Sequence, residues 1–276
     1  MSLPSLAEWL RCPRCLRDLR AMGALVLGCE GGHRFDANRR GYVSLLPPRP
    51  AVVGDSAAML DARAAFLDAG WYSPIRDALA ELSRADAGDR VLDVGCGTGY
   101  YLSGVLGATT GIHALASDLS PAAVARAVRA TGADGLVADV WRPLPVRTAA
   151  ATLVLNVFAP RNPEEFARVL ASGGALLCVV PTAEHLVELR RAGLAIDVPA
   201  NKSSHVAERL GDAFALERTL PVRFPMSLTG GDVMALIGMG PSAHHAAALA
   251  DGITAAAGPA RTVTASVDVL RFRRVG

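Results

Sequence analysis

A glycine-rich turn between a strand and a helix is the feature that most constrains how this chain can fold. Residues 91–99 read VLDVGCGTG, and the apolar start predicts a strand over 90–94. Gly95 and Gly97 let the backbone turn sharply and approach a ligand closely. A dinucleotide fingerprint has glycine at the sixth place of this pattern, where the chain has Tyr100. The turn therefore indicates a ligand-binding α/β sheet, with a plain tight turn as the alternative.

Strands alternate with helices on the C-terminal side of this turn. Such alternation predicts a parallel, doubly wound sheet. Ser120, followed by a proline, is a suitable N-cap for one of the helices. The predicted strands are 90–94, 113–117, 136–138, 152–157 and 175–180, and the predicted helices are 121–130 and 164–170, the latter ended by Gly173-Gly174.

Two further apolar runs, 214–224 and 261–272, predict a closing antiparallel pair of strands. The residues between them have helical patterns over 232–238 and 244–250. The sheet is therefore predicted to be mixed at one edge.

Acidic residues stand at the ends of three predicted strands. Asp93 begins the glycine motif, Asp118 ends the second strand and Asp139 ends the third. The carboxyl ends of parallel strands form the ligand-binding edge of such sheets. Asp118 is placed to accept hydrogen bonds from two ribose hydroxyls. Asp139 is placed to accept a hydrogen bond from an adenine amino group.

This order of parts resembles that of the class I S-adenosylmethionine-dependent methyltransferases, over residues 55–276. The resemblance implies a Rossmann-like, mostly parallel seven-stranded sheet. It also implies that the amino-acid part of S-adenosylmethionine meets the glycine turn, including Thr98 and Gly99, and that its ribose meets Asp118. An NAD enzyme or a degenerate relic is the alternative.

Four metal-ligating residues lie near the N-terminus. Cys12, Cys15, Cys29 and His33 follow the spacing C-x2-C-x13-C-x3-H, which matches a closed structural zinc site. Four protein ligands leave no open coordination position, so the zinc is expected to be structural. The alternative is a set of unpaired thiols in a loop. Cys96 and Cys178, which lie in the turn and the fifth strand, are expected to be small core residues rather than nucleophiles.

The segment around the zinc ligands is basic. Residues 9–50 contain eight arginines against three acidic residues, a net charge of +5, so the rest of the chain carries −3. A rigid basic module suits phosphate binding, and Phe35 and Tyr42 are candidates for stacking on bases. A solvated basic surface or a protein-docking site is the alternative. The arginines are Arg11, Arg14, Arg17, Arg20, Arg34, Arg39, Arg40 and Arg49.

A change in composition and a proline-rich segment divide the chain into three parts. With 51% hydrophobic and 20% charged residues, it can bury a core and is not disordered. Residues 1–48 are expected to form an independent zinc-binding, RNA-recognition module, followed by a stiff proline-rich linker. Residues 49–87 are expected to be that linker and a helical lead-in, and 88–276 the methyltransferase domain. No signal peptide or membrane span is evident, which predicts a cytoplasmic protein.

Nearly the whole chain resembles the bacterial 23S rRNA guanine-N1 methyltransferases, among them the tylosin-resistance type. Ala57 stands where a basic residue is common in that family, which puts one RNA contact in doubt. Met239-Gly240-Pro241, with His244 and His245, is closer to the tylosin-type branch. The resemblance rests on the four zinc ligands, Gly41-Tyr42-Val43, Leu45-Leu46, Gly54-Asp55, Met59, Ala62-Arg63, Phe66-Leu67, Gly70, Tyr72, Pro74, residues 93–101, Phe158-Ala159-Pro160, residues 164–170, Gly173-Gly174, Pro181 and His185-Leu186.

The family resemblance implies methylation of guanine N1 in a hairpin loop of 23S rRNA, and with it macrolide resistance. It implies that Tyr72 and His185 contact S-adenosylmethionine, with a core tyrosine and a surface histidine as the alternatives. No general base can be identified from the sequence, and a homodimer is possible. Two rivals stay open: a zinc-bearing RNA-binding protein with an inactive methyltransferase domain, and a small-molecule methyltransferase of antibiotic biosynthesis.

Overall fold

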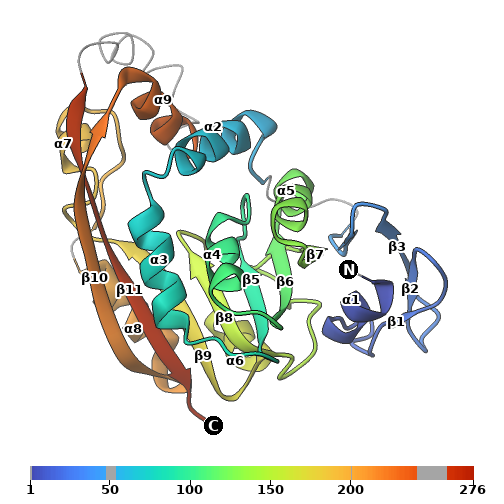
Figure 1. Ribbon diagram of the computed structural model, residues 1–276. Helices are drawn as coiled ribbons and strands as arrows, with labels where there is room; N and C mark the ends of the chain where they lie inside the picture. Colours follow the sequence, from blue (N-terminus) through green and yellow to red (C-terminus); the bar gives the residue numbers. More distant parts are fainter. Residues whose placement is uncertain (1, 48–53, 200, 241–259) are drawn as a thin grey trace.

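A computed structural model describes residues 2–47, 54–199, 201–240 and 260–276. These residues form one mixed sheet of eleven strands in the order β1-β2-β3-β4-β7-β6-β5-β8-β9-β11-β10, flanked by helices on both faces (Figure 1). The N-terminal strands lie at one end of the sheet, and the antiparallel pair β10 and β11 lies at the other.

Seven of these strands make up the predicted methyltransferase sheet. The central five run parallel, and β11 pairs antiparallel with β9 and β10. The mostly parallel seven-stranded sheet and its closing antiparallel pair are thus confirmed. Their bounds are β5 (Arg90–Val94), β6 (His113–Asp118), β7 (Asp134–Val137), β8 (Ala151–Val157), β9 (Leu170–Pro181), β10 (Phe214–Leu228) and β11 (Arg261–Arg274).

Two strands begin two or more residues earlier than predicted. β7 starts at Asp134, and β9 starts at Leu170, directly after the helix before it. Gly173 and Gly174 therefore lie inside β9 rather than ending a helix. A register shift between β8 and β9 accommodates this irregular start.

Helices cover the two faces of the sheet and enclose two hydrophobic clusters. The first cluster lies under α2 (Ala57–Asp68), α3 (Ser73–Ser83), α4 (Tyr100–Ala108), α5 (Pro121–Thr131), α7 (Val187–Arg191) and α9 (Gly230–Gly238). The second lies under α1 (Leu3–Trp9), α6 (Pro163–Val169) and α8 (Lys202–Leu210), which the 3-10 turn η1 (Gly211–Ala213) follows. Along the central parallel strands, neighbouring residues alternate between the clusters, as Val91 and Leu92 do in β5.

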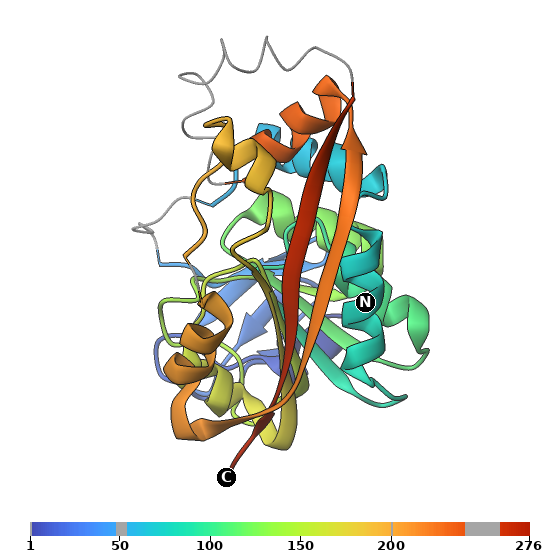
Figure 2. The same ribbon diagram turned by 90° about the vertical axis from the view of Figure 1, so that its left-hand side faces the viewer.

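Local sequence explains several helix ends. The Ser120 side chain accepts a hydrogen bond from the Ala123 amide and caps α5, as predicted, and Pro121 follows it in the first turn. Thr229 and Asp232 form a capping box at the start of α9. The antiparallel strands β10 and β11 run along one side of the molecule, and α9 follows β10 at the far end of the pair (Figure 2). The helix expected over 244–250, with His244 and His245, lies outside the described residues.

The N-terminal module is not independent of the sheet, contrary to the prediction from the sequence. Its strands are β1 (Arg20–Ala21), β2 (Val26–Gly28), β3 (Arg34–Asn38) and β4 (Tyr42–Ser44). β4 pairs in parallel with β7 and so extends the methyltransferase sheet. The helix α1, which the sequence pattern did not predict, buries Leu6 and Trp9 in the second hydrophobic cluster.

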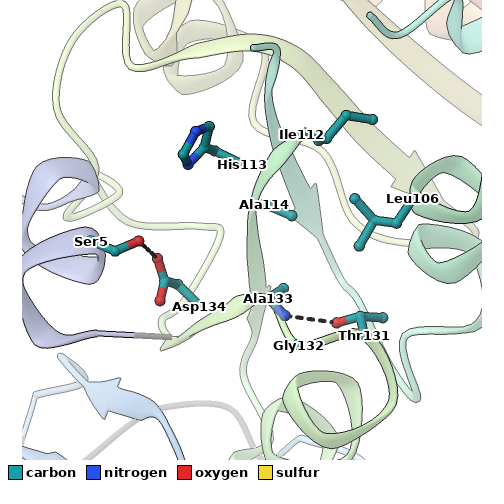
Figure 3. A pocket seen from close by; sticks show the side chains of 9 residues that line it. All are labelled: Ser5, Leu106, Ile112, His113, Ala114, Thr131, Gly132, Ala133 and Asp134. Carbon is teal, nitrogen blue, oxygen red and sulfur yellow. Dashed lines mark hydrogen bonds between the residues drawn. The ribbon is translucent and has the colours of Figure 1, made fainter. Parts of the chain in front are cut away.

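Arg147 fastens the module to the body of the protein. Its guanidinium donates hydrogen bonds to the carbonyls of Ala7, Leu10 and Leu19 at 2.8–3.0 Å. Ser5 Oγ donates to Asp134 Oδ2 at 2.6 Å and joins α1 to β7 (Figure 3). The pocket drawn there, about 170 Å³, lies at the amino ends of β6 and β7. It is therefore at the opposite edge of the sheet from the glycine turn.

The helices in the described part of the chain are too short or too polar to cross a lipid bilayer.

Candidate functional site

The glycine turn joins β5 to α4 at the carboxyl edge of the sheet. Gly95, Gly97 and Gly99 all have positive φ, at +86°, +52° and +84°. A Cβ atom at Gly95 would lie 2.4 Å from the Cβ of Ala159, which is closer than real Cβ atoms approach one another. The turn therefore requires glycine both for its backbone conformation and for its close contact with the loop after β8.

Asp118 holds this turn from the end of β6. Its Oδ2 accepts a hydrogen bond from the Gly97 amide at 3.0 Å, and its Oδ1 accepts one from the Ser120 amide at 2.9 Å. Burial raises the pKa of Asp118, and the two amides oppose that shift. Each carboxylate oxygen can accept more than one hydrogen bond, so both can still receive ligand hydroxyls.

Asp93 is a buried carboxyl group directly before the turn. It is 2% exposed, so the carboxyl group is almost entirely removed from water. Burial, together with the charge of Asp118, raises its pKa to about 8. A buried acid in this state fits a cationic ligand group, because a cation would stabilise its ionised form. The ammonium of the amino-acid part of S-adenosylmethionine is such a group.

Tyr72 and His185 meet at the same edge. The Tyr72 hydroxyl lies 3.2 Å from His185 Nε2, and His185 Nδ1 accepts a hydrogen bond from the Ser266 amide at 3.1 Å. Burial and the charges of Arg190 and Lys202 lower the pKa of His185 to about 4, so its ring is neutral. The proton is therefore on Nε2, which donates to Tyr72, and the Tyr72 hydroxyl remains free to donate to a ligand.

Phe158 projects from the loop after β8 in a strained conformation. Its φ is +51°, which is rare for a bulky residue, and it is 40% exposed. Its ring lies 6.1 Å from the rings of Tyr72 and His185 and 6.2 Å from that of Tyr101. The loop thus presents an aromatic face beside the turn.

Asn156 anchors this loop. It is fully buried in β8, and its Nδ2 donates to the carbonyls of Val94 and Pro160 at 3.2 and 2.9 Å. Its Oδ1 has no partner among the described residues. This buried amide therefore holds the loop after β8 against the end of β5.

Asp139 follows β7 at the same edge, as predicted. Its Oδ1 accepts a hydrogen bond from the Trp141 amide at 3.0 Å, and its Oδ2 lies 3.8 Å from Arg142 Nε. The carboxylate is 8% exposed and is already engaged by the loop that follows β7.

The structure therefore brings the cofactor residues expected from the sequence to one edge of the sheet. Their contacts with the cofactor stay predictions.

The four predicted zinc ligands converge in the N-terminal module. Their ligand atoms lie within 4.8 Å of one another. His33 Nδ1 is 3.5 Å from the sulfurs of both Cys12 and Cys29, and Cys15 Sγ is 3.5 Å from Cys29 Sγ. A tetrahedral zinc with Zn–S bonds of about 2.3 Å and a Zn–N bond of about 2.0–2.1 Å has edges of about 3.5–3.8 Å. The four residues thus fit a structural zinc ion.

The remaining two cysteines are buried. Cys96 and Cys178 are 6% and 0% exposed, and burial raises the pKa of both thiols. They are core residues, as predicted, and are not suited to act as nucleophiles.

Fold and site together define a class I S-adenosylmethionine-dependent methyltransferase with a Cys3His zinc module. A family model described as a methyltransferase domain matches residues 68–220, and one described as RlmA, N-terminal, matches residues 10–49. Among solved structures, a methyltransferase in complex with its activator from Haloferax volcanii covers 82% of this chain and is itself covered completely, with 19% identity and a TM-score of 0.56. At that identity the likeness shows the fold alone.

Curated relatives identify the family. The 23S rRNA (guanine(748)-N(1))-methyltransferase of Streptomyces fradiae is 42% identical over 87% of this chain and 88% of its own. A Micromonospora griseorubida protein, provisionally named a 23S rRNA (guanine-N(1)-)-methyltransferase, is 43% identical over 99% of both chains. A provisionally named Bacillus subtilis relative is 34% identical over 86% of this chain and 87% of its own. The chain belongs to the 23S rRNA guanine-N1 methyltransferase family.

Proposed function

We propose that this protein transfers the methyl group of S-adenosylmethionine to N1 of a guanine in a hairpin loop of 23S rRNA. The observation that carries the proposal is the 42% identity to the Streptomyces fradiae enzyme over 87% of this chain. That relative is named for guanine 748.

The cofactor is proposed to lie across the carboxyl edge of the sheet. Asp118 would accept hydrogen bonds from the ribose, and Asp139 would face the adenine. The ammonium of the amino-acid part would lie near Asp93, above the turn formed by Gly95, Gly97, Thr98 and Gly99. Tyr72, with its donor proton oriented by His185, would hydrogen bond to the cofactor. The burial of Asp93 and the free Tyr72 hydroxyl support this arrangement.

The target guanine is proposed to lie against Phe158. Bound S-adenosylmethionine supplies a methyl group already activated on a sulfonium, so the protein mainly has to align the acceptor nitrogen with it. A base drawn out of a hairpin needs a surface on which to stack. The exposed ring of Phe158, fixed in place by its strained backbone and by Asn156, provides such a surface. His185 is not the base for the N1 proton, because Nε2 already carries a proton and Nδ1 accepts from Ser266.

Residues 1–48 are proposed to bind the RNA. Arg14, Arg17, Arg34, Arg39 and Arg40 are exposed on the module. Phe35 and Tyr42 are half-buried and pack against the two hydrophobic clusters, so the stacking role suggested for them by the sequence is not favoured. Charge, rather than aromatic stacking, would then supply the affinity of this surface. An rRNA substrate would place the activity in the cytoplasm.

Nucleoside analysis tests the proposed reaction. Unmodified 23S rRNA treated with the protein and S-adenosylmethionine should yield 1-methylguanosine on digestion. Expression in a macrolide-sensitive strain should raise tolerance to tylosin-type compounds. An inactive methyltransferase domain would leave the RNA unmodified, and a small-molecule enzyme would leave it unmodified while methylating a macrolide precursor. Methylation at another guanine position would contradict the proposal.

A further inference from the structure

Arg63, on α2, lies directly on the glycine turn. Its Nη1 is 3.1 Å from the position that a Cβ atom at Gly97 would occupy. The same Nη1 is 2.5 Å from Asp55 Oδ2, and Nη2 donates to the Met239 carbonyl at 2.8 Å. The side chain is 23% exposed, so the guanidinium is partly shielded from water but remains accessible to a ligand.

The charges around the turn are otherwise acidic. Asp93 lies near the carboxyl end of β5, Asp118 ends β6, and Asp55 is paired with Arg63. These carboxylates suit the positive groups of S-adenosylmethionine, but they repel its carboxylate. That carboxylate needs a cation on the turn, where the amino-acid part is expected to lie.

Arg63 has N–H groups left with which to bind such a carboxylate. A guanidinium has five N–H donors, and the contacts with Asp55 and Met239 use two of them among the described residues. Its planar fork matches the geometry of a carboxylate.

We propose that Arg63 binds the carboxylate of the amino-acid part of S-adenosylmethionine. This inference rests on the cofactor assignment but not on the identity of the methyl acceptor. Arg63 and Asp93 would together recognise a zwitterion, with the arginine on its negative end and the aspartate on its positive end.

A purely structural role is the competing explanation. Arg63 also joins α2 to Asp55 and to the end of α9, so its removal could weaken cofactor binding by loosening these elements. Decarboxylated S-adenosylmethionine separates the two explanations, because it keeps the adenosine, the sulfonium and the amine and lacks only the carboxylate.

Calorimetric titration of both ligands into the wild type and Arg63→Ala provides the test. The wild type should bind S-adenosylmethionine about ten- to hundredfold more tightly than the decarboxylated ligand, as expected for a charge-assisted contact. In Arg63→Ala this preference should fall to about one, through loss of affinity for S-adenosylmethionine alone. Arg126→Ala is a matched control, because it removes an arginine–aspartate pair, with Asp61, between α2 and α5.

Equal weakening of both ligands in Arg63→Ala, or an unchanged preference, would overturn the proposal. So would a wild type that binds the two ligands equally. A wild type that binds neither ligand would instead contradict the cofactor assignment. If Arg63→Ala does not fold, Arg63→Gln keeps the length and some hydrogen bonds of the side chain, and should lose the same preference because it lacks the charge.

Discussion

At the scale of single residues, the strained backbone of Phe158 is the clearest sign of a functional position. A bulky residue with positive φ costs stability, and such strain persists where the surroundings enforce it. Here Asn156 fixes the loop from below, while Tyr72, Tyr101 and His185 surround the ring. These contacts keep the ring at the edge where the target base is expected.

Phe158→Leu should therefore impair methylation more than cofactor binding. Stacking of a base on an aromatic ring contributes about 1–3 kcal/mol, so kcat/KM for rRNA should fall about 5- to 150-fold. Phe158→Tyr keeps the aromatic face and should retain most of the activity. Steady-state kinetics and calorimetry with S-adenosylmethionine provide the comparison. If Phe158→Leu lost cofactor affinity as strongly as activity, Phe158 would belong to the cofactor site instead.

Asp93 should make the stability of the cofactor-free protein depend on pH. Its folded-state pKa of about 8 lies above the ordinary value of 3.8, so folding favours the protonated form. This stabilising contribution is fully present below about pH 4 and is lost as the pH rises through about 8. Asp93→Asn should thus be less sensitive to pH in denaturant unfolding over this range. An identical pH dependence in both proteins would show that Asp93 is already ionised.

At the scale of helices and strands, local patterns predicted most of the sheet. The five parallel strands are short apolar runs bounded by turn residues, and the Ser120 cap is a local signal. The helix α1 was missed because seven residues hold too little periodicity. The pairing of β4 with β7 was missed because residues 42–44 and 135–137 are far apart in sequence, and no local pattern encodes their contact.

In the candidate site, too, local sequence predicted some residues, while others depend on contacts between distant parts of the chain. Motif spacing predicted the zinc ligands and the acidic strand ends, because those residues are close in sequence or follow a strand. The roles of Arg63 and Arg147 depend on contacts with residues more than 100 positions away, as with Met239 and Ala7. Such contacts are visible only in the folded chain.

Loss of zinc should unfold the N-terminal module and lower the stability of the methyltransferase domain. The apparent binding free energy of a structural zinc is about 10–16 kcal/mol, comparable to the whole stability of a domain. Trp9, Leu10, Leu19 and Leu27 of the module are fully buried in the second hydrophobic cluster, so its loss would expose that cluster. Cys29→Ser should therefore lower the melting temperature of the entire protein.

Elemental analysis and thermal melts check this expectation. The wild type should contain about one zinc per chain, and a chelator should lower its melting temperature. The same chelator should leave Cys29→Ser unchanged. A metal-free wild type with freely titratable thiols and an unaltered melt would contradict the structural zinc site.

At the scale of the whole molecule, charge is divided between the basic N-terminal segment and a mildly acidic body. Residues 9–50 carry +5 and the rest of the chain −3. Because β4 and α1 are part of the sheet and of the second hydrophobic cluster, deleting residues 1–48 would damage the body as well. Point changes on the exposed surface are therefore the better test of RNA binding.

Replacing Arg39 and Arg40 with alanine should weaken RNA binding and reduce its salt dependence. Each phosphate contact contributes about 0.7–0.9 to the slope of log K against log salt, so the slope should fall by about 1.4–1.8. Arg209 and Arg218 are exposed and belong to α8 and β10, which lie at the other end of the sheet from the N-terminal strands (Figure 1). Replacing these two arginines removes the same charge and serves as the control. Equal effects of the two pairs would show that net charge, rather than this surface, governs binding.

Primer extension on 23S rRNA tests the central claim most directly, because a methyl group on guanine N1 blocks base pairing and stops reverse transcriptase. Unmodified rRNA treated with the protein and S-adenosylmethionine should give one strong new stop, next to a hairpin-loop guanine. The stop should be absent without the cofactor and strongly reduced with Asp118→Asn. Full-length extension with a wild type that binds S-adenosylmethionine would contradict the assignment of this chain as a 23S rRNA guanine-N1 methyltransferase.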